Sequence, residues 1–579
     1  MGEQQAEADW VDGADTARGR AETDWPLRPW LFAALLALAG LAIFLLTDDA
    51  HESGPRIAGA AFIAFAAGGF VFTAERGRLL AAAIFSLVTG LVVGGLTWRA
   101  VGAGNDIADS GYAVAAGVFA CLLAVPLFQA DFLQRRMRTD YRDIHYFVWT
   151  DAITGAGAFA FFLIAWALIW LLASLFDLVG IPLRDLVQAD WFGWVYGGLT
   201  LGAGLGTLRN QLKIIGTLQS VVLLVLSILA LPLAIAIAVF LGAVVVSGPS
   251  VLWNATDSAT TVLLSIAIGA YMLANAVLRD RDADMIGGAV LKWSGYALML
   301  GILPLTVFAA ISTGVRIDQH GLSPERLWAL CSIIVAVAFG LAYFVDALVG
   351  VLGSWRDRLR ASNLRLGLAT ALFALFLALP ILNVGAISTS DQLARLESGA
   401  ISLEEFDFSA LRWDFGEPGR QALERLAKSE RTRVAELAQN TLQLESKPYG
   451  STNLPEREEI SQKADLSGLN DETARAVRAF LRDEIILCRE GCRVETLRAS
   501  PEGVLIALMT KAEYGDNPHL LWVAAGSDKA ETRRVYDGKL IHEYEGLDGP
   551  VEYDGDIELR PFEGQQIFVD GKPASQPFK

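Results

Sequence analysis

Charged side chains are scarce in this chain of 579 residues, of which 19% are charged and 53% hydrophobic. Average soluble domains carry about a quarter charged residues. The scarcity is concentrated in residues 29–387, where 20 basic and 21 acidic side chains nearly cancel. A charge-poor stretch of this length excludes a purely soluble protein and a disordered chain. It also excludes a nucleic-acid binder that relies on a basic surface.

Residues for metal and nucleophile chemistry are also few, with five histidines and four cysteines in the whole chain. The sequence has no phosphate-binding glycine loop, no metal-binding histidine pair and no G-x-S-x-G motif. The many carboxylates of the C-terminal part fit a solvated acidic surface better than a paired acid/base site. We therefore expect no cofactor and no metal, and a non-enzymatic role is favoured although no residue decides the question.

Long apolar runs fill the middle of the chain. A bilayer core about 30 Å thick needs roughly 20 apolar residues as helix, because each residue rises about 1.5 Å. About eleven segments meet this criterion, which predicts a mainly α-helical, polytopic membrane bundle over residues 29–387. The segments are Trp30–Leu46, Ile57–Ala74, Leu79–Trp98, Tyr112–Phe128, Ala152–Leu175, Trp191–Leu208, Val221–Val246, Thr260–Leu278, Trp293–Thr313, Leu327–Val349 and Leu366–Gly385.

Basic residues alternate between the loops that join these segments. Even-numbered loops contain 15 of the 20 basic residues and odd-numbered loops contain five. Because cytoplasmic loops hold the excess of Lys and Arg, the N-terminus is predicted to be cytoplasmic and the C-terminal part to be outside. In a bacterium this means the inner membrane and the periplasm. Residues 1–28, with seven acidic and three basic side chains, lack a basic signal-peptide region and are expected to be a disordered acidic arm.

Few polar side chains lie within the predicted spans. Asn275 and Asp346 are candidate intramembrane functional residues, and Glu75 and Asp151 also lie near span ends. Because all four are near span ends, contact with water or headgroups explains them better than a functional site. No span carries a central series of acids or histidines, which lowers the case for an ion-coupled carrier.

Glycines and prolines interrupt several spans. The sixth span has small-xxx-small spacing, which predicts close helix packing, with a flexible gate as the alternative. Its glycines are Gly193, Gly197, Gly198, Gly202 and Gly206. Prolines remove an amide donor and are predicted to kink helices at Pro126, Pro232, Pro304 and Pro380.

One outward loop, Arg316–Arg326, is compact and polar. Ser323-Pro324 predicts the start of the next helix, with the serine as cap. The candidate functional residues of this loop are Arg316, Asp318, His320 and Arg326. A lone loop histidine is more often structural than ligand-binding, so both interpretations stay open.

Residues 388–579 carry 24 basic and 36 acidic side chains and are predicted to form an exterior α+β domain, helical to about residue 485 and β-rich beyond. Ser402–Glu405 matches a capping box, and a helix over 471–483 is expected to be capped by Asn470. Apolar runs at 503–509 and 520–524 predict strands. Asp-Gly pairs predict hairpins of an antiparallel sheet and begin at Asp537, Asp548, Asp554 and Asp570.

The four cysteines fall into two pairs. Cys121 and Cys331 lie within spans and are expected to pack there. Cys488 and Cys492 stand four residues apart in the exterior domain, where an oxidising compartment permits a disulfide. A disulfide is favoured, with free thiols or a redox-active pair as alternatives; a zinc site is not expected because no histidine pair is near.

Three stretches around the end of the last span carry a family resemblance. They are Pro380-Ile-Leu-Asn-Val-Gly-Ala-Ile-Ser388, Gln392-Leu-Ala-Arg-Leu-Glu-Ser-Gly399 and Phe406-Asp-Phe-Ser-Ala-Leu-Arg412. Together with the polar loop at Arg316, Gly321, Leu322 and Arg326, they resemble the domain-of-unknown-function 4153 family. The resemblance covers most of residues 30–430. It implies a bacterial multi-pass inner-membrane protein without assigned catalytic or binding residues.

These patterns favour a membrane module that presents a periplasmic α+β domain for envelope assembly, sensing or partner binding. Its partners would be the lipid bilayer and envelope proteins, and not nucleic acid; the oligomeric state is not predicted. One alternative is a transporter or flippase, which the prolines and the glycine-rich span suggest. Another is an envelope enzyme that acts on a lipid-linked substrate at the polar loop.

Overall fold

The computed structural model describes residues 21, 25–48, 53–135, 139–248, 259–279, 289–350, 355–403, 405–444, 447, 461–483, 488, 491–510, 518–527, 530–532, 568–569 and 572–573. Contacts divide the chain into two units. The helical unit comprises Met1–Gln392 and Asp414–Pro418, and the C-terminal unit comprises Leu393–Trp413 and Gly419–Lys579. The boundary expected at residue 388 thus falls inside a helix, α15 (Val384–Ser398), which contributes to both units. Most of the predicted acidic arm lies outside the described residues.

Among the described residues, ten helices are long and apolar enough to cross a membrane, which makes this a multi-pass membrane protein. They are α2 (Arg28–Thr47), α3 (Gly54–Thr73), α4 (Leu79–Ala103), α5 (Ser110–Gln129), α6 (Tyr141–Asp177), α9 (Leu212–Ser247), α11 (Ala259–Leu278), α12 (Ala289–His320), α13 (Pro324–Gly350) and α14 (Trp355–Ala378). The predicted sixth span is also helical, as α8 (Asp190–Arg209), and follows the short helix α7 (Leu183–Val187). It is less apolar because six of its 20 residues are glycine.

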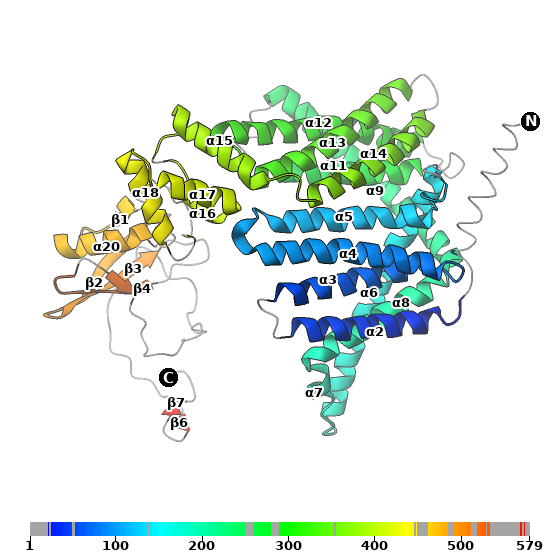
Figure 1. Ribbon diagram of the computed structural model, residues 1–579, viewed down its shortest axis with the longest axis horizontal. Coiled ribbons are helices and arrows are strands. Elements are labelled where there is room, and N and C mark those ends of the chain that lie inside the picture. The colour runs from blue at the N-terminus through cyan, green and yellow to red at the C-terminus, as the bar shows by residue number, and fades with distance from the viewer. Residues whose placement is uncertain are drawn as a thin grey trace, which may run out of the picture. The chain divides into compact units, whose positions relative to one another are not determined.

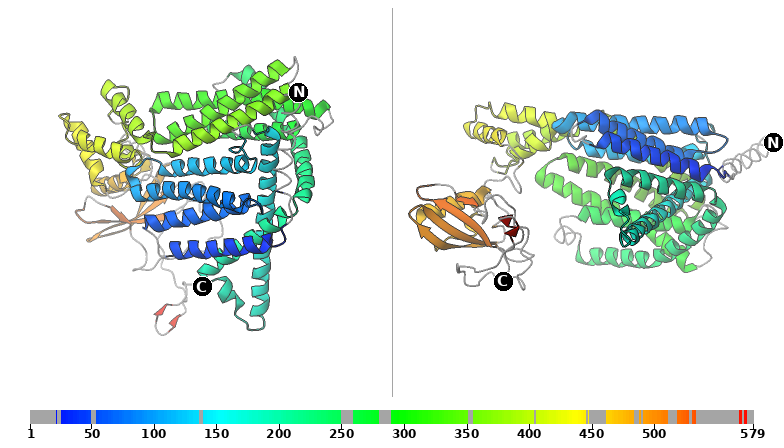
Figure 2. Two further views of the ribbon diagram at one scale, coloured as in Figure 1. Left: turned by 45° about the vertical axis from the view of Figure 1, so that its right-hand side comes forward. Right: turned by 90° about the horizontal axis from the view of Figure 1, so that it is seen from below.

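Apolar cores hold the described long helices together. One core gathers side chains from α2, α3, α4, α6 and α8, including Phe32, Val71 and Leu205. Another gathers side chains from α9, α11, α12, α13 and α14, including Leu298 and Tyr343. A smaller core joins the start of α6 to the start of α9. Figure 1 shows α2, α3, α4 and α5 side by side in chain order. We call α2 to α8 the first half of the bundle and α9 to α14 the second half. Helix α5 also packs against α14, so this contact joins the two halves. Further views of the same bundle are given in Figure 2.

The glycines of α8 allow its backbone to lie directly against that of α2. A Cβ added at any of three α8 glycines would collide with α2 backbone atoms, and one α2 glycine is equally close to α8. The antiparallel pairs are Gly206 with Pro29, Gly202 with Phe32, Gly198 with Leu36 and Gly40 with Trp194. Gly193 and Gly197 approach rings of α6 instead. The predicted packing role of the glycine-rich segment is therefore confirmed.

Some predicted boundaries are wrong. Helix α14 begins at Trp355 rather than Leu366 and ends at Ala378, so the arginine-rich segment before residue 366 is helical. Arginine has a high helix propensity, and a helix does not end where its apolar run ends. Pro380 therefore lies beyond the helix, whereas Pro126, Pro232 and Pro304 are inside helices as predicted.

The described part of the C-terminal unit has helices first and then a sheet, with one more helix between the first two strands. The helices are α16 (Phe408–Trp413), α17 (Gly416–Leu426), α18 (Thr432–Gln443) and α20 (Asp471–Asp483). The start of α17, up to Pro418, belongs to the helical unit. The sheet has the order β1 (Ala464–Asp465), β2 (Cys492–Ser500), β3 (Gly503–Thr510), β4 (Pro518–Ala524) and β5 (Ala530–Thr532). Strands β2 to β5 pair antiparallel, but β1 pairs parallel with β2, so the sheet is not wholly antiparallel as expected.

Helix α20 packs on this sheet through Val477 and Leu481, which share a core with Ile506 and Leu521. The predicted cap forms, because Asn470 Oδ1 accepts a hydrogen bond from the Thr473 amide at 2.8 Å.

Two further local predictions have different outcomes. Ser402 and Glu405 exchange the hydrogen bonds of a capping box, but no helix starts there; α16 starts at Phe408, capped by Asp407. A separate pair, β6 (Phe568–Val569) and β7 (Lys572–Pro573), flanks the predicted turn at Asp570. That turn and the pairs at Asp537, Asp548 and Asp554 lie outside the described residues.

Candidate functional site

The polar loop between α12 and α13 is shorter than predicted. Helix α12 continues to His320, and Gly321 then adopts a φ of +73°, a left-handed conformation that favours glycine after a helix end. Helix α13 begins at Pro324, and the Ser323 hydroxyl accepts a hydrogen bond from the Arg326 amide at 3.3 Å. The predicted serine cap is confirmed, whereas the loop itself is reduced to residues 321–323.

The four candidate residues of this loop are consequently divided between two helices. Arg316 and Asp318 lie in the last turns of α12, His320 is its last residue, and Arg326 is in the first turn of α13. The side chains of Asp318 and His320 are exposed, and Arg316 and Arg326 are partly buried. Only Arg326 and the carbonyl group of His320 enter the hydrogen-bond set described next.

Helix α15 holds the turn between α12 and α13 through two adjacent side chains. Asp391 Oδ2 accepts a hydrogen bond from the Leu322 amide at 2.7 Å. Gln392 Nε2 donates to the carbonyl oxygens of His320 at 2.8 Å and Leu322 at 3.1 Å. Arg326 Nη1 donates to the carbonyl oxygen of Gly321 at 2.8 Å from the other side. We call Asp391, Gln392 and Arg326 the clasp.

Asp391 was not among the predicted site residues, and Gln392 was named only in a stretch that resembles the domain-of-unknown-function 4153 family. In the sequence, the two residues could be noticed only as adjacent polar side chains shortly after the last predicted span. That signal identifies no partner, because the turn they bind lies about 70 residues earlier in the chain.

A closed ring of three hydrogen bonds joins α11, α13 and α14. Asn275 Nδ2 donates to Tyr343 Oη at 2.6 Å, Tyr343 Oη donates to Asn363 Oδ1 at 2.7 Å, and Asn363 Nδ2 donates to Asn275 Oδ1 at 2.7 Å. All three side chains are buried. In lipid an unpaired polar group is costly, so a ring in which each member has partners fixes these three helices against one another.

The other predicted intramembrane residue, Asp346, lies one turn after Tyr343 on α13. Its Oδ2 accepts a hydrogen bond from the Ser362 hydroxyl at 2.8 Å. Asp346 is therefore close along the chain to the ring but hydrogen-bonds outside it. Asn363 and Ser362 were missed because the sequence placed them in a loop next to the arginines of α14.

Two buried arginines satisfy the C-terminal ends of helices in the other half of the bundle. Arg209 Nη1 donates to the carbonyl oxygens of Phe72 and Val71 in the last turn of α3. Arg28 Nη1 donates to the carbonyl oxygen of Arg209, the last residue of α8. Helix C-terminal carbonyls lack intrahelical donors and carry partial negative charge, so both arginines bind where a cation is favourable.

The same region contains Asp151 of α6 and Gln129 of α5. Gln129 Nε2 donates to the Phe72 carbonyl oxygen at 2.8 Å and to Asp151 Oδ1 at 3.1 Å. Asp151 Oδ2 and Gln129 Oε1 are both buried and have no hydrogen-bond partner. We call Asp151, Gln129 and Arg209 the buried polar site.

Two ion pairs lie at the start of α4, after the end of α5 and at the start of α6. Arg78 pairs with Asp131, and Arg135 Nη1 lies 3.1 Å from Asp143 Oδ2. Asp143 is completely buried. In these two pairs each aspartate has an arginine in direct contact, whereas no ion pair of the described residues includes Asp151.

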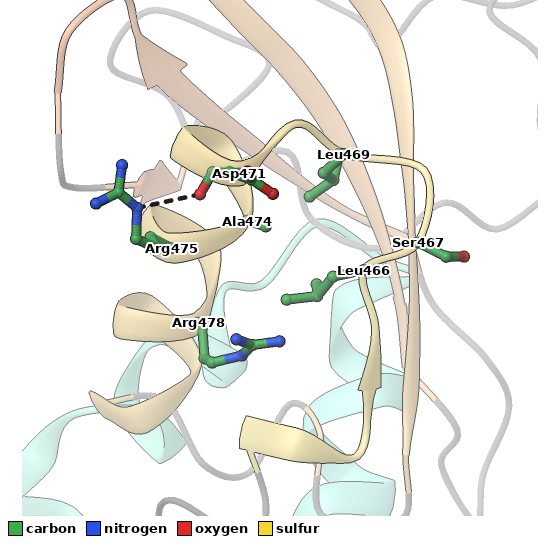
Figure 3. Close-up of a pocket in the computed structure, with 7 residues that line it drawn as sticks. All are labelled: Leu466, Ser467, Leu469, Asp471, Ala474, Arg475 and Arg478. Atoms are coloured by element: carbon green, nitrogen blue, oxygen red, sulfur yellow. Dashed lines mark hydrogen bonds between the residues drawn. The ribbon is translucent and has the colours of Figure 1, made fainter.

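The C-terminal unit has a hollow of about 780 Å³ at the start of α20. Figure 3 shows that Arg478 points toward the segment with Leu466, whereas Arg475 points away and its Nε donates to the Asp471 carbonyl oxygen at 3.2 Å. Arg478 Nε is buried without a hydrogen-bond partner. Ser467, which also lines the hollow, donates two hydrogen bonds to Asp465 and so lowers the pKa of that carboxyl. The hollow has the chemistry to receive an anionic group, although Asp471 opposes this.

Cys488 and Cys492 form a disulfide with their Cα atoms 5.0 Å apart, and both lie in the core beneath the sheet. Cys121 of α5 and Cys331 of α13 are free thiols. On the described segments, no three His, Cys, Asp or Glu side chains are close enough together to hold a metal ion.

Comparison of the chain with known protein families, with curated proteins and with solved structures finds no match. The functional interpretation therefore depends on the chemistry of the sites described above.

Proposed function

We propose that the helical unit anchors and positions the C-terminal unit, which acts in envelope assembly, sensing or partner binding. The clasp is the observation that carries this proposal. It binds the first half of α15 to the turn between α12 and α13, and α15 then continues into the C-terminal unit. A helix held by side-chain hydrogen bonds at the point where the chain leaves the bundle is suited to hold an attached domain.

The polar groups of the second half of the bundle support the same proposal. Asn275, Tyr343 and Asn363 use their hydrogen bonds on one another, and Asp346 uses Ser362. Groups satisfied in this way stabilise a fixed arrangement and offer little to a passing substrate. They favour an anchor over the alternative of a transporter or flippase.

We also propose eleven crossings of a bacterial inner membrane, with the N-terminus cytoplasmic and the C-terminal unit periplasmic. The antiparallel packing of α8 along α2 supports the eleventh crossing. Hydrogen bonds connect segments on the arginine-rich side with one another: Gln129 with Phe72, Arg28 with Arg209 and Arg360 with Arg279. This grouping agrees with the alternation of basic residues in the sequence.

Membership of the domain-of-unknown-function 4153 family is part of the proposal. Its support is the sequence of residues 380–412 together with the turn after α12. Asp391 and Gln392 of the clasp lie within the first stretch and bind the turn, which gives these residues a physical role in binding α15 to the bundle.

Truncation tests the proposed function. Removal of residues 400–579 is expected to leave a membrane-inserted protein that fails to complement the phenotype of a deletion strain. The double variant Asp391→Ala/Gln392→Ala should reproduce much of this loss. Ser390→Ala is the matched control, because its hydroxyl donates within α15 to the Ile387 carbonyl oxygen. Full complementation by the truncated protein would refute the proposal.

A reporter fused after Lys579 tests the orientation separately. Activity confined to the cytosol would contradict the periplasmic location. Labelling of Cys488 and Cys492 in intact cells, with and without reductant, measures sidedness and disulfide state together.

A further inference from the structure

We propose that the buried polar site binds a proton, held on Asp151 as a neutral carboxyl group within the helical unit. This inference goes beyond the anchoring function and does not depend on it. The two carboxylate oxygens of Asp151 have different surroundings. Oδ1 accepts a hydrogen bond from Gln129 Nε2 at 3.1 Å, whereas Oδ2 is buried and has no partner.

The Nη1 groups of the nearby cations bind the ends of helices rather than Asp151. Arg209, whose charge faces Asp151, directs Nη1 to the carbonyl oxygens at the end of α3, and its Nε is buried without a hydrogen-bond partner. Arg28 directs Nη1 to the end of α8. No ion pair joins Asp151 to a cation of the described residues, although Arg78 and Arg135 each pair with another aspartate nearby.

The charges of the region balance without a charge on Asp151. A helix C-terminus acts as roughly −0.5 elementary charge, so the ends of α3 and α8 together offset one arginine. Glu75, which is buried and whose charge also faces Arg209, offsets the other. Tyr146 is the remaining titratable group that faces Arg209.

A proton also satisfies the unmatched hydrogen-bonding groups. An ionised carboxylate only accepts hydrogen bonds, whereas a protonated one also donates. The neighbouring Gln129 Oε1 is a buried acceptor without a donor. A neutral Asp151 supplies a donor beside these two acceptors, and it avoids the cost of burying a carboxylate oxygen that carries charge and has no partner.

Proton release would be coupled to helix packing. Ionised Asp151 would attract Arg209, whose guanidinium now holds the carbonyl oxygens at the end of α3. The proton on Asp151 therefore stabilises the contact between α3 and α8, and its loss would weaken that contact.

Infrared spectroscopy of the full-length protein in lipid bilayers tests the proposal, because the carbonyl stretch of a neutral carboxyl is separate from carboxylate bands. Wild-type protein at neutral pH should show a neutral-carboxyl band that shifts in heavy water. Asp151→Asn should lose this band. The matched variant Asp143→Asn should keep it, since Asp143 is paired with Arg135.

Thermal unfolding provides a second measurement in the same bilayers. The wild-type midpoint should fall as the pH rises above about 4, where an aspartate of the unfolded chain ionises, and should stop falling once Asp151 of the folded protein is ionised. Asp151→Asn should remove that fall. If Asp151→Asn does not insert, alkaline titration of the wild-type band still tests the site. Absence of the band from wild-type protein, or its full retention in Asp151→Asn, would overturn the proposal.

Discussion

Replacement of Gly202 by alanine tests the packing of α8 on α2. The added Cβ would lie 2.5 Å from the carbonyl carbon of Phe32 and 2.7 Å from the amide nitrogen of Ala33. Carbon atoms pack best at about 3.5–4.0 Å, so the two backbones must separate by roughly 1 Å. Overpacking of this kind costs about 1–3 kcal/mol.

Gly216→Ala in α9 is the control, because an added Cβ there has nothing within 4 Å. Both substitutions gain about 1 kcal/mol of helix propensity. Because the gain in helix propensity is the same for both variants, their stabilities should differ only by the cost of overpacking. Gly202→Ala should therefore be less stable than Gly216→Ala by about 1–3 kcal/mol. Equilibrium unfolding of the purified protein in mixed micelles measures both. Equal stability of the two variants would refute the packing of α8 on α2.

A rescue experiment separates backbone from side-chain collisions. At Gly117 of α5 the added Cβ meets the end of the Leu96 side chain rather than backbone. Leu96→Ala should therefore relieve Gly117→Ala. Phe32→Ala should not relieve Gly202→Ala, because the collision there is with the Phe32 carbonyl group. Rescue by Phe32→Ala would show that the two backbones are not in contact.

Three further predictions concern the ring and the C-terminal unit. Asn363→Leu should destabilise the protein by about 1–3 kcal/mol for each buried group left unpaired, and unchanged unfolding in micelles would contradict the ring. Burial lowers the pKa of His519 below its ordinary 6.5. The unfolded state therefore binds more protons in acid, and the C-terminal unit should lose stability as the pH falls through 6.5, a loss that His519→Leu should reduce in thermal melts. Cys492→Ser should lower stability by about 2 kcal/mol, because the disulfide closes a short loop; equal melting of reduced and oxidised protein would contradict this.

The sequence predicted the features that depend on local composition. Apolar runs predicted the ten helices of the described residues that are able to cross a membrane, because a run of about 20 apolar residues is long enough to span the bilayer core. The caps at Ser323 and Asn470 and the strands at 503–509 and 520–524 were also predicted, since each depends on neighbours only a few residues away. Helix ends were predicted less well, as α12 and α14 show, because polar residues continue a helix beyond its apolar part.

The tertiary structure decided which polar residues act together. Gln129 meets Asp151, Arg28 meets Arg209, and Asp391 meets the turn after His320, over separations of 22, 181 and 69 residues. Sequence identifies the chemistry of each side chain but not its partner. Whether an aspartate has a cation in direct contact, as Asp143 has, or lacks one, as Asp151 does, depends on the distance to the nearest cation. Folding sets that distance by bringing helix ends together.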